Sequence, residues 1–126
     1  MPTSDKRKKI LVVDDDEFHL AIANAMLSDE FEIYVVKSGK EALGILGKGF
    51  VPDLILLDVM MPDMDGWETF NRIKAIGLLH TAPIAFVTTT KEAADEKLAK
   101  EIGAVDFIIK PFEKEALLKR VRALVK

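Results

Sequence analysis

The 126-residue sequence contains no cysteine, which excludes disulfide bonds, thiolate metal sites and cysteine nucleophiles. It has a single tryptophan and a single tyrosine, and its net charge is only −3. So small a net charge gives no reason to expect direct binding of nucleic acid. No apolar run approaches the roughly 20 residues that a membrane-spanning helix needs, so no membrane association is expected either. What remains is the composition of an ordinary globular domain.

The amino end is basic at residues 6–9, and this run leads only into the short apolar stretch 10–13 and then into three acidic residues. Such a stretch is too short for a secretory signal, so we expect the chain to stay in the cytoplasm. A nucleic-acid-binding arm is the alternative interpretation of the basic run. A solvated lead-in to the first strand is the favoured one, because only four basic residues are involved.

Five short apolar runs punctuate the chain, at residues 10–13, 33–36, 54–57, 84–87 and 107–109. Each run is apolar on successive residues rather than on alternating ones. This pattern is typical of strands in a parallel sheet that helices cover on both faces.

Segments with helical spacing of apolar residues lie between and after these runs. The residues expected on the buried helix faces are Leu20, Ala23 and Leu27; Ala42, Leu43 and Leu46; Phe70, Ile73 and Ile76; Ala94, Leu98 and Ile102; and Leu117, Leu118, Val121, Leu124 and Val125. Five strands alternating with five helices predict a doubly wound α/β fold with a five-stranded parallel sheet. We expect one domain over residues 1–126, with its core at about 9–125 and no output domain in this chain.

Polar residues follow four of the expected strands at the point where each strand ends. Asp14 and Asp15 follow the first strand, Asp58 the third, Thr88 the fourth and Lys110 the fifth. In open α/β sheets the ligand site lies at the carboxyl ends of the strands, where the strand order reverses. In the order 2-1-3-4-5, the first and third strands are neighbours, and their three carboxylates would converge in one pocket.

Carboxylates packed that closely repel one another unless a positive charge lies among them. A hard divalent cation such as Mg²⁺ meets this need, since it prefers carboxylates, water and phosphate oxygens. A carboxylate beside bound Mg²⁺ can attack a phosphoryl group and form an aspartyl phosphate. Phosphoryl transfer then needs positioning and charge neutralisation, which the Lys110 ammonium and the Thr88 hydroxyl could assist.

Each of these residues also has a purely structural interpretation. Residues 14–16 could cap the first helix, and Asp16 is expected to be its N-cap. Asp58 could form a turn, Lys110 could be solvated, and Thr88 could simply favour the β conformation. A common functional site is favoured because all four positions fall at the required strand ends.

The chain resembles the receiver domains of two-component response regulators, including the stand-alone chemotaxis regulator, over roughly residues 9–125. The matching segments are Ile-Leu-Val-Val-Asp-Asp at 10–15, Asp-Leu-Ile-Leu-Leu-Asp-Val-Met-Met-Pro-Asp-Met-Asp-Gly at 53–66, Val-Thr at 87–88 and Gly-Ala-Val-Asp-Phe-Ile-Ile-Lys-Pro-Phe at 103–112. The resemblance implies a flavodoxin-like fold. It also implies a phosphoacceptor domain for phosphorelay signal transduction, which has no enzyme activity beyond its own phosphotransfer and slow autodephosphorylation.

The resemblance also implies the metal and phosphoacceptor residues. Asp58 would be the phosphoacceptor, and Asp15 and Asp58 would bind Mg²⁺ directly. Asp14 would act largely through a bound water, and the backbone carbonyl of Met60 would complete the protein ligands.

Further implied roles concern the response to phosphorylation. Thr88 would follow the phosphoryl group inward, Phe107 would turn inward with it, and Lys110 would pair with the phosphoryl group next to a cis Lys110–Pro111 bond. The surface formed by the fourth helix, the fifth strand and the fifth helix would then change and present the signal.

The resemblance implies partners as well. A sensor histidine kinase or a histidine phosphotransfer protein would donate the phosphoryl group, and an output domain or target protein of unknown identity would receive the signal. A homodimer that forms on phosphorylation is a further arrangement that the family allows. The histidines His19 and His80 are expected to be surface residues with no part in the site.

Three rival functions fit the sequence less well. A phosphatase of the haloacid-dehalogenase kind would need an aspartate two residues after Asp58, and Met60 stands there. A receiver-like module that works without phosphate would lack part of the site. A flavin-binding module would have to place the cofactor's phosphate against the acidic loop after the first strand, which would repel it.

Overall fold

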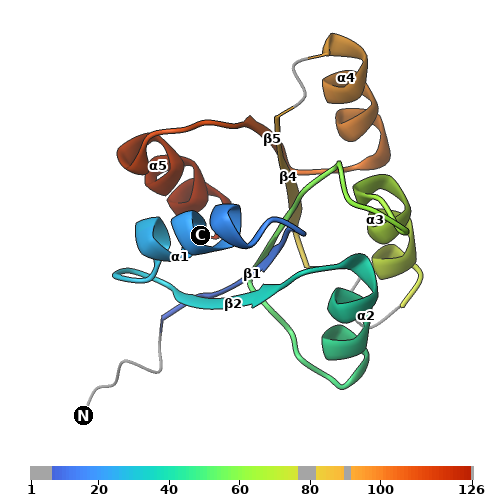
Figure 1. The fold of residues 1–126 in the computed structure, drawn as a ribbon, viewed down its shortest axis with the longest axis horizontal. Coiled ribbons are helices and arrows are strands. Elements are labelled where there is room, and N and C mark those ends of the chain that lie inside the picture. The colour runs from blue at the N-terminus through green and yellow to red at the C-terminus, as the bar shows by residue number, and fades with distance from the viewer. Residues whose placement is uncertain (1–6, 77–81, 90–91, 126) are drawn as a thin grey trace.

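The computed structural model describes residues 7–76, 82–89 and 92–125 (Figure 1). Within these ranges the elements alternate strictly: β1 (Lys9–Val13), α1 (Glu17–Leu27), β2 (Glu32–Val36), α2 (Gly39–Gly47), β3 (Leu54–Leu57), α3 (Gly66–Lys74), β4 (Ile84–Thr88), α4 (Ala93–Ile102), β5 (Asp106–Ile109) and α5 (Lys114–Leu124). None of the helices described has the length and apolarity needed to cross a bilayer. His80 lies outside the described residues.

The five strands form one parallel sheet in the order β2-β1-β3-β4-β5. Figure 1 shows α1 and α5 on one face of this sheet and α2, α3 and α4 on the other. The predicted doubly wound fold and its strand order are therefore confirmed, and every strand lies within one residue of its predicted bounds. This order places the ends of β1 and β3 side by side.

The central strands contribute to two separate hydrophobic cores, one on each face. In β1, Leu11 and Val13 belong to the core beneath α2, α3 and α4, whereas Ile10 and Val12 belong to the core beneath α1 and α5. Alternate residues of a strand point to opposite faces, so a strand with both faces covered must be apolar at every position.

The edge strands depart from the prediction that every strand is covered on both faces. Val35 of β2 has 47 % of its surface exposed, and Ile109 of β5 is also exposed. An edge strand has a neighbouring strand on only one side, so its side chains keep more contact with solvent than those of the central strands. The apolar runs therefore located these strands correctly but overestimated their burial.

The predicted buried faces are right for α1, α2, α3 and α5 and wrong for α4. Ala94 and Leu98 of α4 are exposed, and Ala99 is the buried residue of that helix. The helix carries apolar residues at both Leu98 and Ala99, so the spacing to Ile102 fits either face. Packing against the sheet selected the smaller side chain and left Leu98 outside.

Candidate functional site

Three carboxylates meet at the carboxyl ends of β1 and β3. Asp14, Asp15 and Asp58 each offer one oxygen within 4.8 Å of the others. The backbone N–H of Asp58 donates to the carbonyl of Val13 at 2.9 Å, which continues the β1–β3 pairing and brings the two strand ends together. Asp14 and Asp58 are buried and Asp15 is exposed, so the cluster is open to solvent on one side.

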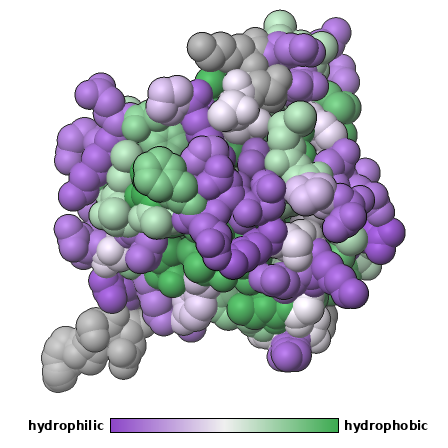
Figure 2. Space-filling view, in the orientation of Figure 1, coloured by the Kyte–Doolittle hydropathy of each residue, from purple (hydrophilic) through white to green (hydrophobic). Residues whose placement is uncertain are grey.

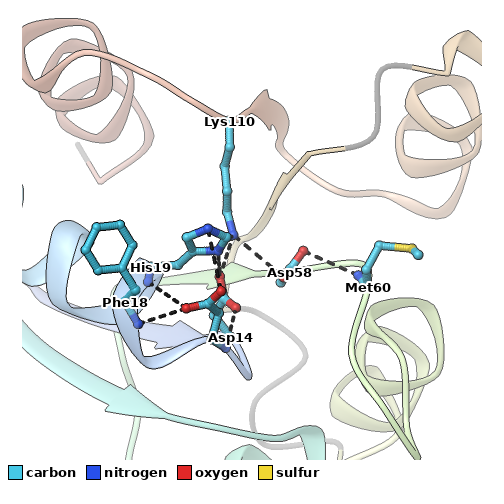
Figure 3. A network of polar contacts seen from close by, with 7 residues as sticks. Asp14, Phe18, His19, Asp58, Met60 and Lys110 are labelled. Atoms are coloured by element: carbon cyan, nitrogen blue, oxygen red, sulfur yellow. Dashed lines mark hydrogen bonds and ion pairs between the residues drawn. The ribbon is translucent and has the colours of Figure 1, made fainter.

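The ammonium of Lys110 lies close to the carboxylates of Asp14 and Asp58, as Figure 3 shows. Its Nζ is 2.5 Å from Asp14 Oδ2 and 3.6 Å from Asp58 Oδ2, and the side chain is only 10 % exposed. The backbone N–H of Lys110 donates to the carbonyl of Thr88 at 2.8 Å, which ties the end of β5 to the end of β4. The Lys110–Pro111 peptide bond is cis, as the resemblance to receiver domains implied.

The pKa of Asp58 is raised to about 6. Burial of the carboxylate is the main cause, and the nearby negative charge of Asp14 adds to it. The Lys110 ammonium and the Met60 backbone N–H, which donates to Asp58 Oδ1 at 3.3 Å, partly offset this rise. Any further positive charge placed beside such a buried carboxylate stabilises its ionised form.

The adjacent aspartates at the start of α1 divide into separate roles. Asp16 is the N-cap of α1, as predicted, and its Oδ1 accepts from the N–H groups of Phe18 and His19. These backbone hydrogen bonds, above all the one from His19, lower the pKa of Asp16. The N–H of Asp16 donates in turn to Asp14 Oδ1 at 3.0 Å, so the cap also orients the Asp14 carboxylate.

The loop after β3 is held close to the start of α3. The N–H of Gly66 donates to the Val59 carbonyl at 2.8 Å. A Cβ atom at position 66 would lie 2.3 Å from the Asp58 carbonyl oxygen, so only glycine fits there. The side chain of Met60 is 65 % exposed and points away from Asp58 (Figure 3). The role of the Met60 carbonyl as a metal ligand stays a prediction.

The two predicted switch residues are both buried in this structure. Thr88 ends β4 and is fully buried. Phe107 of β5 is buried with its ring centroid 6.5 Å from that of Phe86, which also packs against Trp67 at 4.7 Å. A continuous row of rings therefore runs from β5 to the start of α3, near the acceptor loop. The switching itself stays a prediction.

His19 is a correction to the sequence interpretation, which placed it on the surface outside the site. Its ring is half-buried, and Nδ1 lies 2.9 Å from Lys110 Nζ and 3.5 Å from Asp14 Oδ2. A lone histidine in a first helical turn gives no sequence signal of such a contact. His19 and Lys110 are 91 residues apart in the chain, and the packing of α1 against α5 brings them together.

The donor set of the cluster is suited to a metal ion. Three carboxylates converge, and no cysteine exists in the chain to favour a softer ion. The acidic cluster could therefore bind a metal ion that prefers oxygen ligands. The exposed Asp15 leaves a path by which an ion could enter.

Comparison with known proteins gives a consistent result. The family model "Response regulator receiver domain" matches residues 10–122. The chain is 39 % identical over 112 residues to a probable cyclic di-GMP phosphodiesterase of Vibrio cholerae, covering 89 % of this chain and 25 % of that protein. It is 37 % identical over 119 residues to the transcriptional regulatory protein CpxR of Escherichia coli, covering 94 % of this chain and 49 % of that protein.

Among solved structures, the chemotaxis protein CheY4 of Vibrio cholerae superposes with a TM-score of 0.86 at 30 % identity, covering 94 % of this chain and 98 % of that one. The chain thus spans a quarter to a half of the two curated relatives but nearly all of this structural neighbour.

Proposed function

Because the chain belongs to the response regulator receiver domains of two-component systems, we propose that Asp58 is its phosphoacceptor and that residues 9–125 form the receiver module. The observation that carries this proposal is the environment of Asp58. Its carboxylate is buried at the end of β3, is destabilised as an anion there, and faces an ammonium and two further carboxylates. This is an arrangement that a bound cation and a phosphoryl group would complete.

The proposed reaction is a transfer from a phosphohistidine. An oxygen of the Asp58 carboxylate attacks phosphorus, an O–P bond forms, and the P–N bond to the donor imidazole breaks. The electron pair of that bond stays on the imidazole nitrogen. The other ring nitrogen carries a proton taken up from solvent, so the donor leaves as a neutral histidine. Lys110, 3.6 Å from Asp58 Oδ2, would offset the charge on the phosphoryl oxygens.

The proposed metal is Mg²⁺, held directly by Asp15 and Asp58, through a water by Asp14, and by the carbonyl of Met60. When bound, it would neutralise negative charge on the acceptor and on the phosphoryl oxygens. Support for this proposal comes from the convergence of three carboxylates and from the exposure of Asp15, since Mg²⁺ usually keeps several water ligands.

The proposed output surface consists of α4, β5 and α5. Thr88 and Phe107 lie beneath it, at the end of β4 and within β5. Exposed apolar residues here are Leu98 of α4, Ile109 of β5 and Val105 in the connection between them, and a protein partner could cover such side chains. We propose a sensor histidine kinase or histidine phosphotransfer protein as donor, and an output domain, a target protein or a second phosphorylated copy as recipient of the signal.

We propose that this chain itself acts in signalling and has no separate enzyme activity. The phosphodiesterase relative is matched over only 25 % of its length, and nothing in its name bears on the matched segment. The haloacid-dehalogenase alternative is not favoured, because Met60 carries no acid group and points away from Asp58.

The test is phosphorylation of the full chain with Mg²⁺ and acetyl phosphate, followed by intact mass and by the fluorescence of Trp67. We expect a mass increase of one phosphoryl group on the wild type and on Asp63→Asn, a matched change at an exposed aspartate of the same loop. We expect no increase on Asp58→Ala. A wild type that takes up no phosphoryl group, or an Asp58→Ala variant that still does, would overturn the proposal.

A further inference from the structure

Among the described residues, three side chains place a polar atom near the ammonium of Lys110, and the proposed reaction does not explain one of them. Asp14 Oδ2 lies at 2.5 Å, His19 Nδ1 at 2.9 Å and Asp58 Oδ2 at 3.6 Å. Figure 3 shows the imidazole of His19 directly beside the lysine nitrogen. The contact with His19 is a hydrogen-bond distance, whereas the contact with Asp58 is longer than a hydrogen bond.

The direction of the hydrogen bond follows from the chemistry of lysine. An ammonium group has three N–H donors and no acceptor, so His19 Nδ1 must accept through its lone pair. The ring proton is then on Nε2, whose neighbour is Asp16 Oδ2 at 3.8 Å. The contact thus determines which tautomer of His19 is present.

The surroundings of the ring favour this orientation. His19 lines a pocket of about 300 Å³ between α1 and the start of α5. Its neighbours in the wall include Ile22, Met26, Phe112 and Leu117, and Figure 2 shows apolar side chains gathered over α1 and α5. One side of the ring therefore faces apolar groups. Among the described residues, its nitrogen atoms lie near polar atoms of Asp14, Asp16 and Lys110, and the Lys110 ammonium is the group that donates to Nδ1.

We infer that His19 is a positioning residue that orients the Lys110 ammonium for the phosphoryl group on Asp58. The inference rests on the proposed function of Asp58. The bonds around an ammonium nitrogen are close to tetrahedral, so hydrogen bonds to His19 and to Asp14 determine the direction of the third N–H. That third N–H faces Asp58 without a close acceptor, and a phosphoryl oxygen on Asp58 would supply one.

The kinetic test compares rates of phosphorylation of the full chain by acetyl phosphate in the presence of Mg²⁺. His19→Leu removes the acceptor and should slow the reaction about fivefold, the order expected for the loss of one hydrogen bond. His19→Asn should restore the rate to within about twofold of wild type, because the amide oxygen of asparagine can take the place of Nδ1. Asn24→Leu, an exposed position on the same helix, is the matched control and should react as wild type does.

A second measurement reports the contact without any phosphorylation. In the metal-free, ¹⁵N-labelled full chain at pH 8, where an ordinary histidine is neutral, the Nδ1 resonance of His19 should shift in Lys110→Met. It should not shift in Lys40→Met, which changes an exposed lysine of α2 on the other face of the sheet. Thermal unfolding of His19→Leu would show that a slower reaction does not reflect loss of the fold.

The outcomes separate the inference from the proposal on which it rests. If the wild type takes up no phosphoryl group, the proposed function fails and the inference fails with it. If the wild type reacts and His19→Leu reacts equally fast, if His19→Asn stays as slow as His19→Leu, or if Nδ1 does not respond to Lys110→Met, the inference alone is overturned.

Discussion

Two regions of the molecule depart from the usual rule that charged side chains are exposed and apolar ones are buried. One is the site at the carboxyl ends of β1 and β3, and the other is the face formed by α4 and β5. At the strand ends, charged groups of Asp14, Asp58 and Lys110 are buried against one another. On the α4–β5 face, the apolar side chains of Leu98 and Val105 are exposed, at 39 % and 45 %. Buried charge requires partners in defined positions, whereas an exposed apolar surface requires none.

The difference shows how one small domain can hold the charged groups of a site in fixed positions and still keep a surface that can rearrange. The strand-end cluster is held by hydrogen bonds from Asp16 and Met60 and by the close packing of Gly66. The α4 helix is anchored through the small side chain of Ala99, so a modest rearrangement there exposes or covers little core. We therefore expect substitutions in the first region to have large effects and those in the second to have small ones.

The largest expected effect on stability comes from breaking the buried ion pair. Lys110→Met leaves the carboxylates of Asp14 and Asp58 buried without their cation, and it should lower the free energy of unfolding by about 3 kcal/mol at pH 7. Arg120→Met removes the ion pair with Asp106 on the α5 surface, where the arginine side chain is half exposed, and should cost less than about 1 kcal/mol.

Urea unfolding of both variants would measure this contrast. Equal losses for Lys110→Met and Arg120→Met would contradict the view that the two ion pairs lie in different environments. Addition of Mg²⁺ should restore part of the stability of Lys110→Met, because a cation bound by the folded state alone raises its stability.

The next effect tests the packing of the acceptor loop. Gly66→Ala would place a methyl group 2.3 Å from the backbone oxygen of Asp58. Relief of that clash should lower the free energy of unfolding by about 1–3 kcal/mol. Gly44→Ala is the matched control, since nothing lies within 4 Å of a Cβ atom there and the residue is within α2. In that control, the higher helix propensity of alanine should raise the free energy of unfolding by about 0.5–1 kcal/mol. A Gly66→Ala variant as stable as Gly44→Ala would show that the loop is not held as described.

A smaller effect, of opposite sign, is expected from neutralising the acceptor. Because the pKa of Asp58 is raised to about 6 in the folded chain, the folded state binds a proton more tightly than the unfolded state does. The contribution of Asp58 to the free energy of unfolding should therefore fall as pH rises from about 4 to 6 and stay lower above that range. Asp58→Asn should remove this loss and stabilise the metal-free chain by roughly 1–2 kcal/mol at pH 7.

Chemical denaturation between pH 4 and pH 8 without Mg²⁺ would test this expectation. The advantage of Asp58→Asn should disappear near pH 4, where Asp58 is protonated in the folded wild type. A variant less stable than wild type at pH 7 would argue that the negative charge of Asp58 is well compensated.

The smallest effect is expected on the α4–β5 face. Leu98→Ala should change the free energy of unfolding by less than about 1 kcal/mol, because the residue is already 39 % exposed and lies outside the buried cores. Leu118→Ala in α5, where the side chain is buried, should cost about 2–4 kcal/mol. Comparable losses from both would mean that Leu98 packs into the core, as its helical spacing had suggested.

That spacing shows where sequence reasoning succeeded and where it failed for the fold. Continuous apolar runs located all five strands, because a strand covered on both faces has no polar position. The face of α4 was assigned to Leu98 rather than Ala99 because apolar periodicity does not distinguish a large exposed residue from a small buried one. The burial of the edge strand β2 was overestimated for a related reason, since a run of apolar residues does not reveal how far the helices extend over it.

For the site, too, some features could be predicted from the sequence and others could not. Asp14, Asp15, Asp58 and Lys110 could be predicted to meet, because each follows a strand and the strand order brings those ends together. The specific roles of Thr88, Phe107 and the Met60 carbonyl stay predictions. The contact of His19 with Lys110 could not be foreseen, since histidine is compatible with an exposed helix position and nothing in its spacing pointed to a lysine 91 residues away.

The sequence by itself determined the alternation of strands and helices, and with it the edge of the sheet at which the acidic residues gather. It could do so because backbone periodicity and strand order depend on local patterns of apolar residues. Only the tertiary structure decided how deeply Asp58 is buried, which side of α4 faces solvent and which nitrogen of His19 meets Lys110. These depend on distances between side chains that are remote in the chain, and such distances are determined only when all the layers pack together.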